Sequence, residues 1–550
     1  MSRITAVLLA LTACGGPGAG SNRPAGPATA PPVAAPAPGA QAADLGAISF
    51  AVTGGTPEAR RAFLRGVLAL HSFWYDEAVD EFKAAVAADP TFVMGHWGLA
   101  FAHAQLLFGA LDDEHARAAL AKLPPLEGAS ARERGWIDAT RILFGEEPQQ
   151  DRLIAFARAM GALHRDYPDD DEIAAFHALA MLSARTPDDP DDLRVRGEAG
   201  AIALGVMARN PRHPGAVHYV IHAFDTPELA PLALPAARAY AGIAPAAFHA
   251  RHMPAHIFAR LGLWEQAMAS CRSAWDASVA AATARKRPLN ARDYHSLTWM
   301  LQFAFERGQR KTADATLAQM RADLDAANTW PLRSSYIGMV EVYMMNTEDW
   351  GRLEELLAPL ARPGVEPPQP APAHLCEAPE GAKPPAPATA AAPATAPPPD
   401  RPPPGFDEGF QLAYLRMGVA LEQRDRATAN RLVREIEALL RKGRPFQIRM
   451  MGAKRFAEEE EKARPFRELD RKLREAHLRH DNRAALPLAR KLAALIDARP
   501  DAEPPVQGGS PHEGIARLLM ELDRPAEALT ELELVLKNHP DRARVLLAAM

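Results

Sequence analysis

The sequence predicts an all-α solenoid built from stacked helix pairs. From about residue 57 onward, amphipathic helical segments alternate with short breaks, and no stretch shows the period-2 alternation of a half-buried strand. Small residues recur where two antiparallel helices must approach each other closely. Aromatic residues make up only 7% of the 550-residue chain, which suits a fold that buries an Ala- and Leu-rich core through local contacts.

The first helix pair gives the clearest pattern. Gly66 and Ala78 allow the two helices to approach, Phe82 fills the gap between them, and Pro90 ends the second helix. Together with Ala85, these positions resemble a tetratricopeptide repeat. The last helix pair resembles the same repeat in Ile515, Ala516, Leu519, Ala528, Leu532 and Pro540. We therefore expect tetratricopeptide-like helix pairs along most of the chain.

Composition divides the chain into five segments. Pro and Ala crowd two of them, and such segments cannot bury enough apolar surface to fold. The predicted segments are a signal peptide (1–13), a Pro/Ala/Gly-rich tether (14–46), a solenoid with a histidine cluster (47–361), a Pro/Ala-rich disordered insertion (362–405) and a C-terminal helical block (406–550). The insertion is either a loop on the solenoid surface or a hinge between two solenoid blocks. The charged tract at 441–483 is expected to be a solvated helix face.

The N-terminus predicts a secreted protein. One early positive charge, a short apolar run and small residues precede Cys14, as in a signal peptide. Leu11-Thr12-Ala13-Cys14 resembles the bacterial lipobox, which implies that Cys14 is lipidated after cleavage; the alternative is an ordinary signal peptide with a chance cysteine. Gly15 then points to the outer membrane, with the protein facing the periplasm. No later run of about 18 apolar residues occurs, so we expect attachment to the membrane by lipid alone.

Charge and motifs exclude several function classes. A net charge of −5 provides no basic field for nucleic acid, and three cysteines imply no disulfide framework. The sequence contains no Gly-x-Ser-x-Gly elbow, no phosphate-binding loop and no His-Glu-x-x-His helix. The remaining candidate for chemistry is a group of histidines.

Two histidine pairs lie one tetratricopeptide period apart. His218 and His222 are each followed 34 residues later by His252 and His256. Residues four apart share a helix face, and the first helices of neighbouring repeats are adjacent, so we expect these side chains on one concave surface. His213 falls outside that surface in this register.

The spacing leads to a metal hypothesis. Imidazole nitrogens suit Zn, Cu, Fe or Ni, and spacing alone does not choose among these metals. The predicted ligands of one ion are His218, His222, His252 and His256. The residues expected to complete or support the site are His249, His295, Asp225 and Asp293.

Two other interpretations of the histidines remain open. Imidazoles in a groove can bind a peptide carboxylate or another small anion without a metal, or they can simply pack. Pro254 adds a further alternative, because a proline either starts the helix after His252 or kinks a helix that begins near Pro245. Only the second arrangement keeps His252 and His256 on one helical face.

A family resemblance extends the prediction. His213 to Asp225 and His252 to Phe258, with His96 to Ala100 and the last repeat, resemble a group of bacterial tetratricopeptide-repeat lipoproteins. The resemblance implies the fold and names no reaction. Our leading hypothesis is an envelope scaffold that binds a protein or peptide in its concave groove. The alternative is a metalloenzyme whose ion sits on the histidine cluster.

Overall fold

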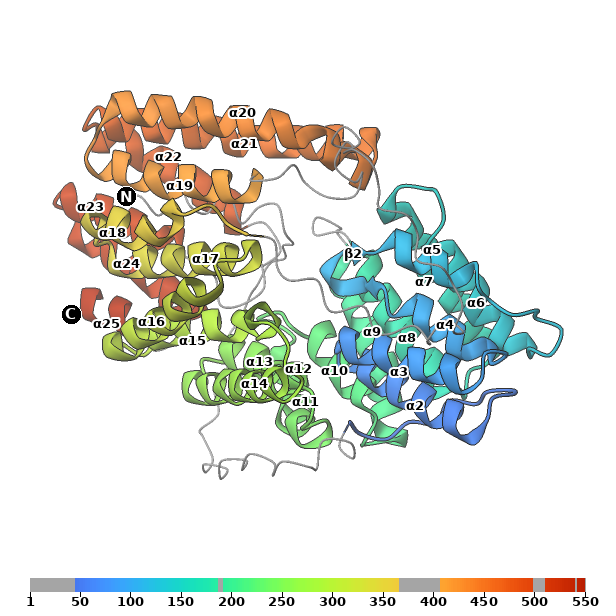
Figure 1. Ribbon diagram of the computed structural model, residues 1–550. Helices are drawn as coiled ribbons and strands as arrows, with labels where there is room; N and C mark the ends of the chain where they lie inside the picture. The colour runs from blue at the N-terminus through green and yellow to red at the C-terminus, as the bar shows by residue number, and fades with distance from the viewer. Residues whose placement is uncertain (1–44, 186–190, 366–405, 498–509, 540–541, 550) are drawn as a thin grey trace.

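The computed structural model confirms the all-α solenoid. It describes residues 45–185, 191–365, 406–497, 510–539 and 542–549. Antiparallel helix pairs stack side by side through these ranges (Figure 1). The first part contains α2 (Pro57–His71), α3 (Tyr75–Ala88), α4 (Val93–Phe101), α5 (Asp113–Leu120), α6 (Ala131–Leu143), α7 (Gln149–Asp166), α8 (Asp171–Ala184), α9 (Asp192–Arg209), α10 (Pro214–Ala223) and α11 (Ala230–Ile243).

The middle of the chain continues the stack. It contains α12 (Phe248–His252), α13 (Pro254–Arg260), α14 (Trp264–Ala284), α15 (Tyr294–Glu306), α16 (Arg310–Ala327), α17 (Trp330–Thr347) and α18 (Leu353–Leu357). The C-terminal block contains α19 (Phe406–Glu422), α20 (Arg426–Met451), α21 (Ala453–Leu478), α22 (Asn482–Asp497), α23 (Pro511–Glu521), α24 (Pro525–Asn538) and α25 (Ala543–Ala549). Within the described residues the strands are β1 (Ala104–Gln105) and β2 (Ala110–Leu111), which pair antiparallel across a short 3-10 turn.

The first helix pair forms as the sequence predicts. The Thr56 side chain caps α2 by accepting a hydrogen bond from the Ala59 backbone N–H at 3.2 Å, and Pro57 takes the first helical turn. A Cβ on Gly66 would lie 2.7 Å from the Phe82 ring, so only glycine lets α2 and α3 pack this closely. Phe73 turns the chain between them in the left-handed region, with φ of 51°.

The first helices of the early repeats close around a shared aromatic core. The Phe50 ring contacts Phe63 and Trp136 at centroid distances of 5.1 and 5.4 Å, and Trp136 contacts Phe176 at 5.3 Å. These rings join α2, α6 and α8 to the extended segment before α2. As a result α2 returns to contact α10, where His71 Nδ1 lies 3.0 Å from the Tyr219 hydroxyl.

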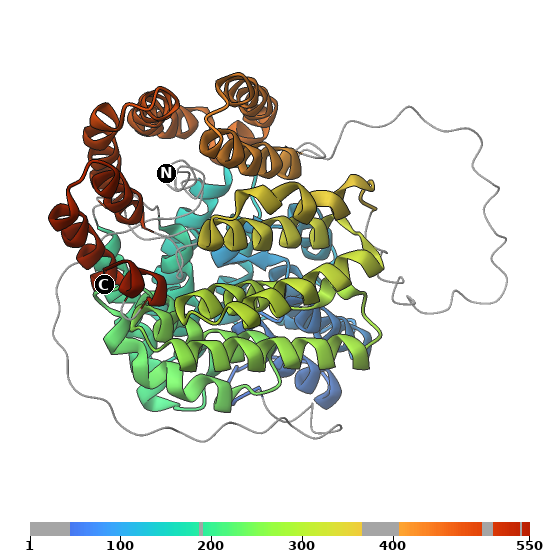
Figure 2. The ribbon, with the colours of Figure 1, turned by 90° about the vertical axis from the view of Figure 1, so that its left-hand side faces the viewer.

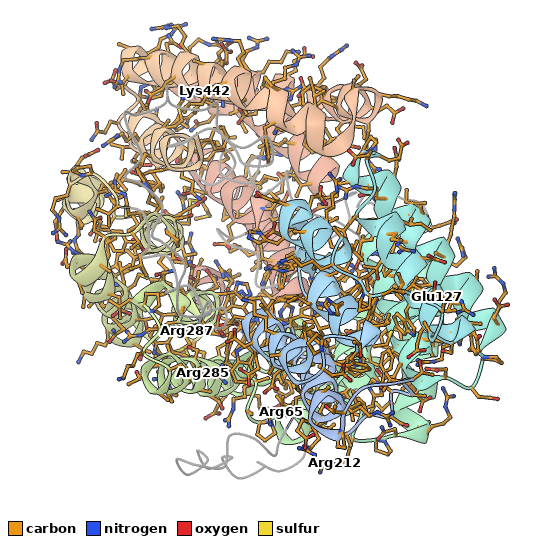
Figure 3. The ribbon with its side chains drawn as sticks, turned by 45° about the vertical axis from the view of Figure 1, so that its right-hand side comes forward. Arg65, Glu127, Arg212, Arg285, Arg287 and Lys442 are labelled. Atoms are coloured by element: carbon orange, nitrogen blue, oxygen red, sulfur yellow. The ribbon has the colours of Figure 1, made fainter. Side chains whose placement is uncertain are left out.

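Ion pairs hold this closure on the outside. Arg285, at the end of α14, pairs with Glu77 of α3 at 2.5 Å and lies over the Trp74 ring at 4.7 Å. Arg287 pairs with Asp80 at 3.0 Å. Figure 3 shows both arginines on the side of the molecule where the first repeat lies. The N-terminal repeat is thereby fixed against repeats that follow it by about 200 residues.

The C-terminal block also packs back onto the middle of the chain. Its helices curl round so that α25 contacts α15 (Figure 2). The nearly buried Arg542 guanidinium pairs with Glu306 of α15, and Arg544 pairs with Glu348 after α17. In α21 the run Glu458 to Glu461 is exposed or half-buried, as expected for a solvated helix face.

The structure adjusts the segment boundaries slightly. Leu45 is buried and the Ala47 backbone N–H donates to the Arg212 carbonyl at 2.9 Å, so the fold begins inside the predicted tether. Val365 N–H donates to the Asn328 carbonyl at 3.0 Å, so residues 362–365 of the predicted insertion also belong to the fold. Cys14 and the rest of that insertion lie outside the described residues. In the described ranges, no helix combines the length and apolar character needed to cross a membrane.

Candidate metal centre

The first histidine pair lies where α10 faces α2. His213 caps α10, because its Nδ1 accepts a hydrogen bond from the Ala216 N–H at 3.1 Å, and Pro214 follows at the first helical position. His218 and His222 then fall one turn apart on the same face. Their Nε2 atoms lie 3.0 Å from each other.

Pro254 breaks the next first helix without separating its histidines. The helix starts at Phe248, ends at His252 and resumes at Pro254 after Met253, which keeps right-handed helical dihedrals. The arrangement is close to the kinked alternative, with the helix starting slightly after Pro245. The Nε2 atoms of His252 and His256 lie 3.1 Å apart across the break.

The histidines form two adjacent triads. We define the first triad as His218, His222 and His249, and the second triad as His252, His256 and His295. Within each triad one nitrogen from every ring lies within 4.8 Å of the others. In the first, His249 Nε2 lies 3.1 Å from His218 Nε2; in the second, the His252 and His295 ring centroids are 4.6 Å apart.

The triads divide the predicted ligands differently from the sequence hypothesis. That hypothesis groups both pairs around one ion, whereas the structure places each pair in its own triad with one supporting histidine. His249 joins the pair of the preceding repeat because it lies at the start of α12, next to α10. The two triads touch: the His222 and His256 ring centroids lie 6.1 Å apart, and those of His249 and His252 lie 6.0 Å apart.

The two predicted acids orient histidines instead of joining the triads. An Asp225 oxygen lies 2.8 Å from His256 Nδ1, and the other lies 2.9 Å from Arg260 Nε. Asp293 caps α15 and accepts a hydrogen bond from the Ser296 hydroxyl at 2.5 Å. The same Ser296 oxygen lies 2.9 Å from His252 Nδ1. Such contacts fix the ring orientation and tautomer of histidines that bind metals.

These contacts determine which ring nitrogens carry protons. A carboxylate only accepts, so Asp225 receives the Nδ1–H of His256. The single Ser296 proton goes to the Asp293 carboxylate, which leaves the serine oxygen to accept the Nδ1–H of His252. The Nε2 atoms of the two rings therefore face each other across 3.1 Å. His218 follows the same rule, because its Nδ1 donates to the His71 carbonyl at 2.7 Å.

The surroundings keep four of the six imidazoles neutral. Burial, together with repulsion between neighbouring imidazoles, holds the pKa values of His218, His222, His249 and His252 well below the usual range. Burial disfavours ionisation of Asp225, but Arg260 and His256 outweigh it and lower the pKa of that carboxyl. The buried Cys271 thiol lies 3.6 Å from His252 Nδ1, and burial raises its pKa. Neutral imidazole is the form that binds metal.

Aromatic rings cover both triads. Phe73, 7% exposed, contacts His218 at a centroid distance of 4.3 Å and stacks on His249 at 5.3 Å. Trp299 contacts His252 at 4.8 Å and His256 at 4.5 Å. His218, His252 and His256 are at most 1% exposed, while His295 is exposed. The triads therefore lie beneath aromatic side chains and reach the surface at His295.

A third polar group lies behind the first triad and was missed by the sequence analysis. His71 Nε2 lies 2.9 Å from Glu172, and His213 Nε2 lies 3.2 Å from the other oxygen of that carboxyl, all fully buried. Burial opposes ionisation of Glu172, but His71 and His213 outweigh it and lower its pKa to about 2. Sequence spacing gives no signal for this group, because His71 and Glu172 are 101 residues apart.

The other histidines near the N-terminal repeats make packing contacts. His96 Nε2 lies 3.0 Å from the Pro90 carbonyl, and the neighbouring Trp97 donates its indole N–H to Thr140 at 2.8 Å. His103 stacks on the exposed His115 beside Asp112. These residues belong to ordinary helix contacts.

Comparisons with known proteins place the chain only by its architecture. No family model matches the sequence, and none of the curated proteins is similar to it. Similar solved structures include the APC/C hetero-tetramer Cut9-Hcn1, at 13% identity over 90% of this chain and 76% of that one with a TM-score of 0.35. Yeast Tom70 gives 9% identity over 89% and 87% with a TM-score of 0.30. A tetratricopeptide repeat protein from Parabacteroides merdae gives 12% identity over 56% and 100% with a TM-score of 0.27. Likeness at this level adds nothing about function.

Proposed function

We propose that this chain is a lipid-anchored envelope protein whose solenoid carries a transition-metal centre in the two histidine triads. One observation carries the metal assignment. The Nε2 atoms of His252 and His256 meet at 3.1 Å, while hydrogen bonds to Ser296 and Asp225 engage their Nδ1 atoms. With both Nδ1 atoms engaged in this way, the two Nε2 atoms are placed to bind one cation.

The spacing of the nitrogens supports the same conclusion. Metal–nitrogen bonds of about 2.0 to 2.1 Å, with angles between octahedral and tetrahedral values, separate two ligand nitrogens by about 2.9 to 3.4 Å. The printed Nε2 separations in the first triad are 3.0 and 3.1 Å, and that in the second is 3.1 Å. A single His–His contact at this distance also occurs between His164 and His177, so the support comes from three nitrogens that converge in each triad.

The test is the metal content of the full chain, purified without a histidine tag and measured by elemental mass spectrometry. We expect near-stoichiometric transition metal in the wild type and its loss in the His218→Ala/His252→Ala variant. The matched control is His103→Ala/His115→Ala, which removes two histidines outside the triads and should keep the metal. Absence of metal from the wild type after reconstitution with Zn, Cu, Fe and Ni contradicts the proposal.

The envelope location rests on the N-terminal sequence. Leu11-Thr12-Ala13-Cys14 resembles a lipobox, and the following 14–43 segment is rich in Pro, Ala and Gly. Labelled palmitate should be incorporated into the wild type in bacterial cells and not into Cys14→Ser. Fractionation of the same cells should place the labelled protein in the outer membrane. Labelling that survives the substitution contradicts the anchor.

A scaffold for protein partners is the second candidate function. Large apolar side chains lie exposed on the C-terminal block: Met520, Leu529, Leu534 and Leu546, each at least 40% exposed. These side chains lie on the neighbouring helices α23, α24 and α25, and we propose that they contact a protein partner. Pull-down from envelope extract with the wild type and with Leu529→Ser/Leu534→Ser should separate specific partners from background. Partners retained equally by both contradict this surface.

A further inference from the structure

We propose that the two triads hold a pair of Cu(I) ions that binds one molecule of dioxygen between them. The inference rests on the proposed metal centre and names its metal and its ligand. Four features of the site support it: the charge of the ligands, their number, the contact between the triads and the aromatic cover.

The ligand charge favours a monovalent metal. All six ligands are imidazoles, and neutral imidazoles cancel none of a metal's charge. The acids near the triads are not among these ligands. Asp225 contacts His256, Asp293 contacts Ser296 and Glu172 contacts His71. Two divalent ions would bring four positive charges into a largely buried site, whereas two Cu(I) ions bring two. Di-iron centres built in helical proteins use several carboxylate ligands, which these triads lack.

The number of ligands in each triad also favours Cu(I). In the described part of the chain each triad offers three nitrogens. Three imidazoles satisfy Cu(I) without a further ligand, whereas a three-histidine Zn site takes a water or substrate as its fourth ligand. The nearest acids are engaged elsewhere, because Asp225 pairs with Arg260 at 2.9 Å and Asp293 accepts from the Ser296 backbone at 3.1 Å. The site therefore leaves each ion with an open position.

The open positions can serve one shared ligand. The triads contact each other through His222 with His256 and through His249 with His252, at ring separations of 6.1 and 6.0 Å. Phe73 and Trp299 cover the two triads with apolar rings. A small neutral molecule enters such surroundings more readily than a hydrated anion. Dioxygen fits this description and reacts with Cu(I).

The step balances in electrons and in charge. Each Cu(I) gives one electron and becomes Cu(II), and dioxygen accepts both electrons to become a peroxide dianion bridging the two ions. No proton is taken up or released. The metal charge rises from two to four while the peroxide brings two negative charges, so the net charge of the buried site remains two. A buried site with fixed acids behind it suits a reaction that leaves its charge unchanged.

The experiment loads the metal-free full chain with Cu(I) under nitrogen and then admits dioxygen. Copper content, dioxygen uptake and electron paramagnetic resonance are measured. We expect two Cu(I) per chain, one dioxygen per two copper ions and no Cu(II) resonance, because two bridged Cu(II) ions couple magnetically. His249→Ala and His295→Ala each remove one ligand from one triad. Each should halve the copper, abolish stoichiometric uptake and give the resonance of isolated Cu(II). His115→Ala should behave as the wild type.

The outcomes separate this inference from the metal proposal. Two zinc or nickel ions with no tight Cu(I) binding would overturn the copper pair and leave the metal centre intact. Two Cu(I) ions that take up no dioxygen would overturn the dioxygen step. Absence of every tested metal would overturn both proposals. The metal-free variants should unfold at the same temperature as the metal-free wild type. This control shows that any loss of copper or dioxygen uptake reflects the triads and not the fold.

Discussion

Asp225 accepts the Nδ1 proton of His256 at 2.8 Å and simultaneously pairs with Arg260 at 2.9 Å. The carboxylate thereby fixes the His256 ring so that its Nε2 faces His252. An amide at this position offers one acceptor and one donor, so it can satisfy only one of the two partners.

Asp225→Asn should therefore weaken metal binding. Loss of such an orienting contact lowers metal affinity by about 10- to 100-fold. Competition titration with a chromophoric Zn chelator measures the change, and thermal unfolding of the metal-free form shows whether the fold survives. Asp112→Asn, which removes an exposed partner of His115, should leave the affinity unchanged. Equal affinity in wild type and Asp225→Asn would refute the orienting role.

Gly98→Ala should destabilise the first repeats. A Cβ at Gly98 would lie 2.2 Å from the Phe82 ring, which is fully buried between α2 and α4 and cannot move aside. Overpacking of this kind costs about 1 to 3 kcal/mol. Gly338→Ala is the matched control, because a Cβ there meets nothing within 4 Å and should stabilise α17 by about 0.5 to 1 kcal/mol. Urea unfolding measures both, and a neutral Gly98→Ala would show that the interface is loose.

Glu341→Gln should change the pH dependence of stability. Burial raises the pKa of Glu341 from its ordinary value of 4.5 to about 7. Since the folded state then holds the proton more tightly, this group's contribution is full below pH 4.5 and is lost as pH rises through 7. The wild type should lose up to about 3 kcal/mol between these limits, and the glutamine variant should lose less. Parallel stability profiles of the two proteins from pH 4.5 to 8 would disprove the shift.

Arg542→Met should loosen the C-terminal block. The buried guanidinium pairs with Glu306 and with Glu513 at 3.2 Å, so the substitution leaves two buried carboxylates without this partner. Breaking a buried pair from one side costs about 3 to 5 kcal/mol. Arg524→Met removes an exposed pair with Glu527 and should cost at most about 1 kcal/mol. Hydrogen exchange in α23 to α25 reports the change, and equal protection in both variants would count against the buried pair.

Local sequence signals predicted the repeats well. Gly66 and Phe82 identify a helix contact within 16 residues of each other, and the structure packs them as expected. The 34-residue spacing of His218 and His252 likewise reflects equivalent first helices. Such signals succeed because the physical contact is formed by neighbours in the chain.

The division into two triads could not be predicted in this way. It depends on how the short helix α12, which precedes Met253, is placed against α10. The contacts of His71 with Glu172 and of Phe73 with His218 depend on the early repeats completing a turn and meeting α10. The spacing of residues in the sequence does not indicate this closure, because the closure follows from the summed rotation of several helix pairs.

The return of α2 to α10 has a consequence for how the architecture can change. Open solenoids tolerate the gain or loss of a repeat, because each unit touches only its neighbours. Here an added helix pair between residues 90 and 213 would rotate α10 away from Phe73 and His71, so the early repeats are fixed in number as well as in sequence. In this region the helix pairs form a closed ring. The histidine site therefore requires a fixed number of helix pairs between α2 and α10.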